Sequence, residues 1–587
     1  MPPRFAFAAL ALLAPLAVAW AAEEEPPTML LEPFPLGDVR LAEGRLLEEQ
    51  ERNHQYLLSL ADDSLLYAFR LNAGLPTPGE PLRQWEDPAS EVRGHFVGHA
   101  LSACAQMYRS TGDEALRAKG AYLVAELAEV QAALGGGYLS AYPESFLDRV
   151  ETGKPVWAAY YTIHKIMAGL LDQYTLCGNA QALEVLEGMV AYLHERNAKF
   201  ETPEALRMYM DRNEEGGMCD GLWGLYGVTG NPAAAELADK MEKRSFLDPL
   251  ARGEDVLARL HGNTHIPLAI GALRRYERTG EKRYLYTGEF FWDRVATARS
   301  FATGGSTNGE VWGEPFALAA HGLSNTTHET CKTHNMLKLS RQLLCLTGEA
   351  KYAEFMERAF LNGILGTQGP EPGQLEYYVP QATGYRRVFG LPLDAFWCCY
   401  GTGVETWSRL TDSIYFHDDD SLTVSQFIAS TLRWADKGVE IEQITRFPYE
   451  EGAAFVVGAA APVPFTLRVR IPEWVAGPVR VTVNGEVQDQ LSPAPGSFLA
   501  LEREWRDGDR VTLSLPMALH AWPMPDDPNL VALMYGPVVL AGLLDEPGSV
   551  PPATSSSATE PMPVTDLVPR YAFLADTVED LSWLERQ

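Results

Sequence analysis

The chain has 587 residues, of which 46% are hydrophobic, a composition typical of globular proteins. Its 78 Asp and Glu residues outnumber its 48 Lys and Arg residues, and the net charge of -30 repels phosphate backbones and anionic membrane surfaces. The charge therefore argues against nucleic acid as a partner, and the length predicts at least two structural units.

The first 22 residues have the features of a signal peptide. Arg4 precedes an apolar run over residues 5–19, and small residues then lead to an acidic segment that begins at Glu23. A retained membrane anchor fits less well, because a membrane-spanning helix needs roughly 20 apolar residues. We therefore expect cleavage of residues 1–22, a mature chain without a membrane span, and export to the periplasm or the extracellular space.

Five helices that end at a glycine predict a repeating helical hairpin. In each, a bulky apolar residue lies four positions before the glycine, and a polar or acidic residue that can begin the next helix follows it. The turns are Thr111-Gly112-Asp113, Cys177-Gly178-Asn179, Thr229-Gly230-Asn231, Thr279-Gly280-Glu281 and Thr347-Gly348-Glu349. Their separations leave room for two helices each, which favours a closed (α/α)6 toroid over residues 23–415. An open solenoid, the alternative, usually has a stricter repeat length.

The longest irregular connections of this helical region cover residues 138–156 and 304–327. Both fall on the same side of the predicted ring. Long loops in a compact domain frequently carry function, so we expect the functional site on that side.

The periodicity changes from helical to alternating near residue 416. Val479, Val481 and Val483 alternate with polar residues and lead into Asn484-Gly485, a strong hairpin signal. This pattern predicts an antiparallel β-sandwich over residues 416–545. Proline and serine are frequent just after it, so we expect residues 546–587 to form an exposed linker and a short tail.

Seven cysteines make a complete disulfide framework improbable, because an odd number leaves at least one thiol free or bound to metal. Cys104, Cys177 and Cys345 lie in apolar helical stretches and are expected to be small packing residues. Cys398 and Cys399 are adjacent, and a disulfide between neighbours is strained, so we expect two thiols. They precede a helix, whose N-terminus favours the thiolate form.

A second segment, His328-Glu329-Thr330-Cys331, opens another helix and supplies a further thiol and a carboxylate. Glu329 and Cys331 can reach one ion only if they lie in the turn before the helix, because residues two apart point to different helix faces. Three sulfurs and one carboxylate suit zinc, and their four negative charges exceed its two positive ones, which leaves one thiolate loosely held. Spacing alone leaves a closed structural zinc site as an equal alternative.

These two segments resemble the retaining β-L-arabinofuranosidases of glycoside hydrolase families 127 and 146. The resemblance rests on Glu329-Thr330-Cys331 with the following Asn335-Met336-Leu337-Lys338-Leu339, and on Cys398-Cys399 with the following Gly401-Thr402-Gly403-Val404-Glu405. It extends to Gly98-His99, Gly137-Tyr138-Leu139-Ser140-Ala141-Tyr142-Pro143-Glu144, Tyr161-Thr162-Ile163-His164-Lys165 and Tyr535-Gly536-Pro537-Val538, and so covers nearly the whole mature chain.

The resemblance implies an enzyme that releases L-arabinofuranose from β-L-arabinofuranosides of plant glycans with retention of configuration. It implies Zn2+ bound by Glu329, Cys331, Cys398 and Cys399, with Cys398 as the nucleophile. The general acid/base of the family lies in a Gly-Glu-x-Phe element, which matches Gly313-Glu314-Pro315-Phe316 and selects Glu314. Glu310 is the rival by proximity.

The resemblance also implies contacts to the sugar. Glu357 and Tyr378 match family positions well, and His164 and His261 match less closely. Aromatic rings and bidentate polar groups are the side chains that sugar sites use. Near the rim, Cys219-Asp220 departs from the Asn-Glu of most relatives, and the role of Cys219 stays open.

Three alternatives remain at this level. The same site can act on an acidic pectic sugar if Arg386 and Arg387, shortly before the cysteine pair, bind its carboxylate. A polysaccharide lyase shares the toroid and sandwich architecture but leaves the cysteine pair unexplained. A glycan-binding protein with a structural zinc is the alternative that is not an enzyme. In each case the partner is an oligosaccharide or glycan, and the oligomeric state stays open.

Overall fold

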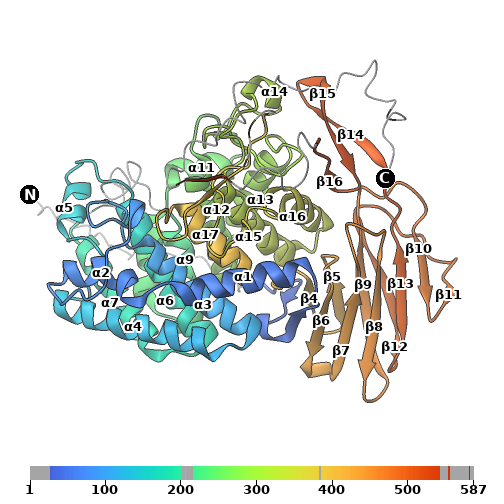
Figure 1. Cartoon of the computed structure of the whole chain (residues 1–587), viewed down its shortest axis with the longest axis horizontal. Helices are drawn as coiled ribbons and strands as arrows, with labels where there is room; N and C mark the ends of the chain where they lie inside the picture. Colours follow the sequence, from blue (N-terminus) through green and yellow to red (C-terminus); the bar gives the residue numbers. More distant parts are fainter. Residues whose placement is uncertain are drawn as a thin grey trace, which may run out of the picture.

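The computed structural model describes residues 27–200, 202, 205, 216–382, 385, 387–542, 553–555 and 581. The predicted signal peptide, residues 1–22, lies outside them. A helical body is followed by a β-sheet region packed at its side (Figure 1). No helix in the described part of the chain is long and apolar enough to cross a membrane.

Six inner helices form a closed ring. Each contacts the next one along the chain, and the last contacts the first. They are α3 (His95–Thr111), α6 (Ala159–Cys177), α9 (Met218–Thr229), α12 (Gly262–Thr279), α15 (Thr330–Thr347) and α17 (Cys398–Ser408). This closure confirms the predicted toroid and excludes the open solenoid.

Six outer helices cover the ring, one against each inner helix. Five directly follow their partners in the sequence: α4 (Glu114–Leu134), α7 (Ala180–Asn197), α10 (Pro232–Met241), α13 (Lys282–Ala296) and α16 (Ala350–Gly363). The sixth, α1 (Arg45–Ser59), comes from the other end of the domain and packs against α17. The five hairpins that the sequence predicts are thus completed by a pair of helices from opposite ends of the helical domain.

All five predicted turns are helix C-caps with glycine in the left-handed region. Their φ angles lie between 68° and 80° at Gly112, Gly178, Gly230, Gly280 and Gly348. These short turns join the C-terminal end of each inner helix to its outer partner. The long connections therefore all lie at the opposite end of the ring, where the inner helices begin.

The remaining helices of the body lie in those connections or next to them. They are α2 (Asp62–Asn72), α5 (Ser145–Glu151), α11 (Arg244–Ala251), α14 (Leu318–His321) and the 3-10 turn η2 (Gln84–Glu86). The predicted functional loops, residues 138–156 and 304–327, precede α6 and α15 and lie at this end, as expected.

Two sheets face each other around an apolar core in the β region. The five-stranded sheet has the order β1 (Glu32–Pro33), β4 (Tyr415–His417), β5 (Ser421–Val424), β9 (Val463–Ile471) and β12 (Ser497–Trp505). The seven-stranded sheet has the order β11 (Glu486–Val487), β10 (Arg480–Val483), β13 (Arg510–Ser514), β8 (Ala453–Ala459), β7 (Val439–Ile444), β6 (Ser430–Trp434) and β2 (Val39–Leu41). All pairs are antiparallel except β5 with β9. Asn484 and Gly485 form the predicted hairpin turn, both at positive φ.

Strands occur in two places where the sequence analysis predicts a helical domain or a linker. Strands β1 and β2 lie in the region predicted to be helical, yet they complete the sheets of the sandwich. Within the predicted linker, β17 (Ala553–Ser555) pairs in parallel with β3 (Val388–Gly390) of the helical body. Strands of two or three residues carry no detectable periodicity, and their partners are distant in the sequence, so alternation alone could not reveal them.

A third sheet of β14 (Leu519–Met524), β15 (Asp527–Tyr535) and β16 (Val538–Val539) reaches back to the helical body. Asp526, in the turn between β14 and β15, accepts hydrogen bonds from the backbone N–H groups of Ala319 and Ala320 at the start of α14. Asn362 of α16 bonds to the backbone of Pro537 and Val539. The sheet region is therefore attached near the loop that leads into α15.

Candidate active site

Each inner helix begins shortly after a residue in the left-handed region. These residues are Gly94, Ala158, Gly216, Arg259, His328 and Phe396, with φ angles between 50° and 97°. Four of them carry a side chain, for which this conformation costs about 1–2 kcal/mol. Strained backbone of this kind concentrates at functional sites, and here it occurs at one end of the toroid.

The candidate metal ligands converge at this end from α15 and α17. Glu329 is the extended N-cap residue of α15 and Cys331 its second helical residue, so the backbone turns between them and their side chains meet. Cys398 and Cys399 are the first two residues of α17. One ligand atom from each of the four residues lies within 4.8 Å of all the others, and all four side chains are buried. The structure thus brings together the whole predicted ligand set.

The distances within this cluster are close to those of a tetrahedral zinc site. Cys331 Sγ lies 3.5 Å from Cys398 Sγ, which lies 3.9 Å from both Cys399 Sγ and Glu329 Oε1. Zinc–sulfur bonds of roughly 2.3 Å at tetrahedral angles would separate two sulfurs by about 3.8 Å. Glu329 Oε1 lies only 2.5 Å from Cys331 Sγ, which is closer than two ligands of one zinc ion would be. The carboxylate would have to move away from this sulfur for both to bind the same ion.

Two further observations fit a cation at this cluster. Glu329 Oε2 is buried and has no hydrogen-bond partner among the described residues, a costly arrangement for a carboxylate. Burial and the neighbouring Cys398 raise the pKa of Glu329 to about 8, and burial raises the pKa of Cys331. All seven cysteines of the chain are free thiols, as predicted for the adjacent pair. The residues present therefore fit a zinc ion.

Glu310, the rival for the acid/base role, lies beside this cluster. Its carboxylate accepts a hydrogen bond of 2.5 Å from the Tyr377 hydroxyl and lies 3.3 Å from His261 Nε2. Carboxylate oxygens of Glu310 and Glu329 and a ring nitrogen of His261 lie within 4.8 Å of one another. Burial raises the pKa of Glu310, but hydrogen bonds from His261, Tyr377 and Tyr378 outweigh it and lower the pKa to about 2. Glu310 itself is in the left-handed region, with φ 67°.

Glu314, which the sequence motif selects, has a different environment. Its side chain is exposed, and it makes no hydrogen bond or ion pair with any described residue. The chain bends between Glu310 and Glu314. As a result Glu314, which matches the family motif, is exposed to solvent. The structure therefore favours Glu310 over Glu314 as the carboxylate that faces the thiols.

Tyr377 is a site residue that the sequence analysis missed. Its hydroxyl lies 3.7 Å from Cys398 Sγ while it donates to Glu310, so it contacts both the thiol cluster and the carboxylate beside it. Tyr378, the predicted sugar contact, is its neighbour, and the backbone of Tyr378 pairs with that of Glu329. The adjacent Tyr pair was visible in the sequence, but the side of the chain that each ring occupies was not.

His261 contacts Glu310 and so lies beside the thiol cluster, whereas His164 has a structural environment. The ring of His164 is buried in α6 and its Nδ1 accepts a hydrogen bond of 3.1 Å from the backbone of Gly217. Burial lowers the pKa of His164 well below its usual value. We find no contact between His164 and the thiol cluster.

Glu357 lies on the outer helix α16, at the interface with the β-sandwich. One of its carboxylate oxygens pairs with Arg470 of β9, and the other accepts a hydrogen bond of 2.7 Å from Trp474 Nε1. Arg470 is fully buried and also contacts Glu354 at 2.9 Å. Both oxygens of Glu357 are thus occupied by the neighbouring domain, and the structure does not bring this residue to the thiols.

Of the two arginines proposed for an acidic sugar, the structure describes only Arg387. Arg386 lies outside the described residues. Arg387 donates to the backbone oxygen of Gly366 and lies 3.7 Å from the buried carboxylate of Glu376. Cys219, whose role was open, is buried and directs its sulfur to the backbone oxygen of Ala238 at 3.6 Å. No observation here favours a carboxylate-bearing sugar.

Comparison with known proteins gives one consistent family. The sequence model of the β-L-arabinofuranosidase GH127 catalytic domain matches residues 38–412, and that of the GH127 middle domain matches residues 421–517. A curated relative, the non-reducing end β-L-arabinofuranosidase of Bifidobacterium longum subsp. longum, is 28% identical over 298 residues. That match spans 46% of this chain and 44% of the relative.

Solved structures show the same fold. A GH127 β-L-arabinofuranosidase from Geobacillus stearothermophilus T6 aligns with a TM-score of 0.68 at 19% identity, over 85% of this chain and 86% of that one. Another GH127 β-arabinofuranosidase aligns with a TM-score of 0.67 at 18% identity, over 87% of this chain and 85% of that one.

Proposed function

This chain belongs to the β-L-arabinofuranosidases of glycoside hydrolase family 127, and we propose that it releases L-arabinofuranose from β-L-arabinofuranosides of plant glycans by way of a cysteine nucleophile. The assignment of roles is ours: Cys398 is the nucleophile and Glu310 the general acid/base. Glu310 replaces Glu314, the residue that the motif selected, because Glu314 is exposed and away from the thiols.

The observation that carries this proposal is the position of Tyr377 between the two reacting groups. Its hydroxyl contacts Cys398 Sγ at 3.7 Å and Glu310 Oε1 at 2.5 Å. The two contacts keep the sulfur and the carboxylate within roughly 6 Å of each other, which is near the spacing of retaining enzymes and leaves little room for the water of an inverting one.

In the first step, Cys398 Sγ attacks the anomeric carbon and the bond from that carbon to the leaving oxygen breaks. Glu310 takes up a proton from solvent as the glycan binds and gives that proton to the leaving oxygen, while the proton of the Cys398 thiol is lost to solvent before the attack. The free site holds Glu310 ionised through His261 and the two tyrosines, so we expect the bound glycan to replace His261 as a partner of the carboxylate.

In the second step, Glu310 takes a proton from water, and that water attacks the anomeric carbon of the sugar bound to Cys398. The carbon–sulfur bond breaks and the sugar leaves with its original configuration. Tyr377 keeps its hydroxyl beside the sulfur in both steps and so orients the nucleophile.

Glu329, Cys331, Cys398 and Cys399 would hold the zinc ion. Bound there, zinc would keep the thiols deprotonated and make the sulfur a better leaving group. The buried, unpartnered oxygen of Glu329 and the spacing of the sulfurs support this part of the proposal.

The test measures zinc content and release of L-arabinose from an aryl β-L-arabinofuranoside for the wild type and for Cys398→Ala. We expect a zinc-loaded wild type that turns over, and a folded variant whose rate falls by at least about 1,000-fold. Cys345→Ala, which removes a buried thiol at the far end of α15, is the matched control and should keep its activity.

A zinc-loaded wild type that is inert on this substrate would contradict the choice of sugar. Unchanged turnover in Cys398→Ala would contradict the mechanism. A glycan-binding protein with a structural zinc would bind its glycan equally well in both proteins and release no sugar from either.

Export is part of the same proposal and is supported by the composition of residues 1–22. Mass measurement of the protein recovered from outside the cytoplasm should show loss of this segment. Recovery of the full-length chain from the cytoplasm would contradict it.

A further inference from the structure

Trp157 is the only exposed tryptophan among the described residues, with 44% of its surface accessible. It lies directly before Ala158, the left-handed residue that precedes inner helix α6. The ring is therefore at the same end of the toroid as the thiols. A large indole left open to water on this face requires an explanation, because the mechanism above does not use it.

The position of Trp157 is fixed by the chain around it. Its backbone N–H donates a hydrogen bond of 2.9 Å to Glu91, and its ring meets that of Trp85 edge to face at 4.7 Å between centroids. Ala158 has φ 53°, a conformation that an alanine adopts only when its surroundings impose it. The indole is thus held in place while its surface remains available.

Polar groups suited to sugar hydroxyls lie beside this ring. Glu91 pairs with Arg149 at 2.8 Å, and the two side chains are 34% and 36% exposed. Glu91 accepts hydrogen bonds from Arg149 and from the Trp157 backbone, and Arg149 also donates to the backbone oxygen of Pro155. The pair is therefore fixed beside the ring with part of each side chain exposed, and the opposite charges cancel. An aromatic face with a carboxylate and a guanidinium next to it is the set of groups that binds a neutral sugar ring.

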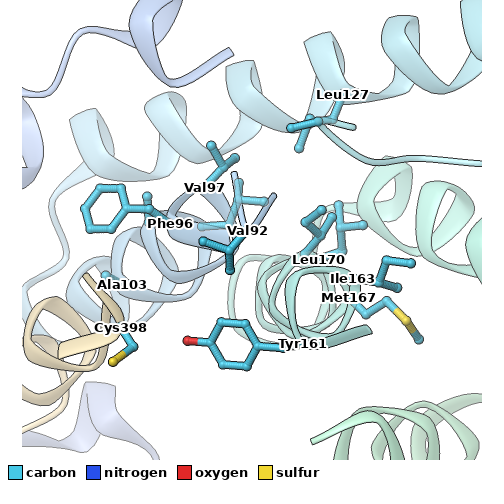
Figure 2. Close-up of a cluster of buried hydrophobic side chains, with 14 of the residues drawn as sticks. Val92, Phe96, Val97, Ala103, Leu127, Tyr161, Ile163, Met167, Leu170 and Cys398 are labelled. Atoms are coloured by element: carbon cyan, nitrogen blue, oxygen red, sulfur yellow. The ribbon is translucent and has the colours of Figure 1, made fainter. Parts of the chain in front are cut away.

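A continuous series of rings links Trp157 to the nucleophile. The ring centroids of Trp85 and His95 are 5.6 Å apart, and those of His95 and Tyr161 are 5.9 Å apart. Figure 2 shows the Tyr161 hydroxyl directed towards Cys398, and both residues belong to one cluster of packed side chains. His95 is fully buried, so these rings pack behind the surface and join the exposed indole to the end of α6 where Tyr161 is directed towards Cys398.

We propose that Trp157, with Glu91 and Arg149, binds the sugar ring on the leaving-group side of the glycosidic bond. This inference rests on the proposed function, because it takes Cys398 as the point of cleavage. The ligand is a neutral sugar residue of the glycan, stacked on the indole and hydrogen-bonded to the charged pair.

The test compares two substrates in the zinc-loaded enzyme: a disaccharide with β-L-arabinofuranose on a second neutral pentose, and methyl β-L-arabinofuranoside, which has no second ring. Trp157→Ala should raise KM for the disaccharide about tenfold with little change in kcat. Its kinetics on the methyl glycoside should match those of the wild type, which also shows that the variant is folded. Trp157→Phe keeps an aromatic face and should recover most of the affinity.

Tyr286→Ala is the matched control, since Tyr286 is 46% exposed on the outer helix α13, stacked on Phe290. It should leave both substrates unaffected. A second measurement uses the Cys398→Ala background, in which disaccharide binding should quench tryptophan fluorescence only while Trp157 is present.

Equal KM for the disaccharide in the wild type and Trp157→Ala, with both enzymes active, would overturn the leaving-group site and leave the proposed function intact. A wild type inert on both substrates would overturn the proposed function and this inference with it.

Discussion

Glu310 and Glu314 are four positions apart, yet only Glu310 faces the thiols. A local motif cannot separate them, because both follow a glycine and both precede an aromatic residue by two positions. The distinction arises from the backbone, which adopts φ 67° at Glu310 and turns its carboxylate towards Tyr377 and His261.

We expect Glu310→Gln to lower kcat by about 100- to 10,000-fold, the usual contribution of a general acid/base. The exposed Glu314 gives the paired control, and Glu314→Gln should stay within about twofold of the wild type. Steady-state kinetics on an aryl β-L-arabinofuranoside distinguish them. A large loss in Glu314→Gln with normal turnover in Glu310→Gln would restore the motif-based assignment.

Five of the six inner helices end where the sequence predicts, because a glycine in the left-handed region stops each of these five. Gly230 ends α9 with φ 70°, and a Cβ built on it meets nothing within 4 Å. Gly221 lies inside the same helix, has ordinary helical backbone, and is equally unhindered. The two positions differ in backbone conformation alone.

Alanine at these two glycines should therefore have opposite effects on stability. Gly230→Ala is expected to lower the free energy of unfolding by about 1 kcal/mol, because alanine is strained at this φ. Gly221→Ala should raise it by about 0.5–1 kcal/mol, because alanine is the better helix former. Urea denaturation followed by circular dichroism measures both, and shifts of the same sign would refute this explanation of the helix ends.

On the scale of the whole molecule, the sandwich and the toroid are joined by a buried charge pair. Arg470 of β9 is fully buried and meets Glu357 and Glu354 of α16, while Trp474 bonds to Glu357. Removal of Glu357 leaves the buried guanidinium with Glu354 as its remaining partner and takes away the acceptor of Trp474. The same arrangement explains why Glu357 is not at the thiols.

Glu357→Ala should lower the stability of the protein by about 3 kcal/mol, as loss of a buried pair does, and leave KM for an aryl arabinofuranoside unchanged. Glu349→Ala, which removes an exposed partner of Lys351 at the start of the same helix, should cost less than about 1 kcal/mol. Thermal unfolding and kinetics on each variant provide the comparison. A raised KM with normal stability in Glu357→Ala would instead make Glu357 a sugar contact, as the family resemblance implies.

The sequence by itself determined the toroid, the sandwich and the identity of the four candidate metal ligands. Glycine turns, alternating strands and cysteines at helix starts are local features, and each depends on residues that are neighbours in the chain. Only the tertiary structure decided that α1 closes the ring, that β1 and β2 complete the sheets, and that Glu310 and Tyr377 face Cys398. These relations join residues far apart in sequence, or depend on a backbone conformation that their neighbours impose, and no local pattern encodes either.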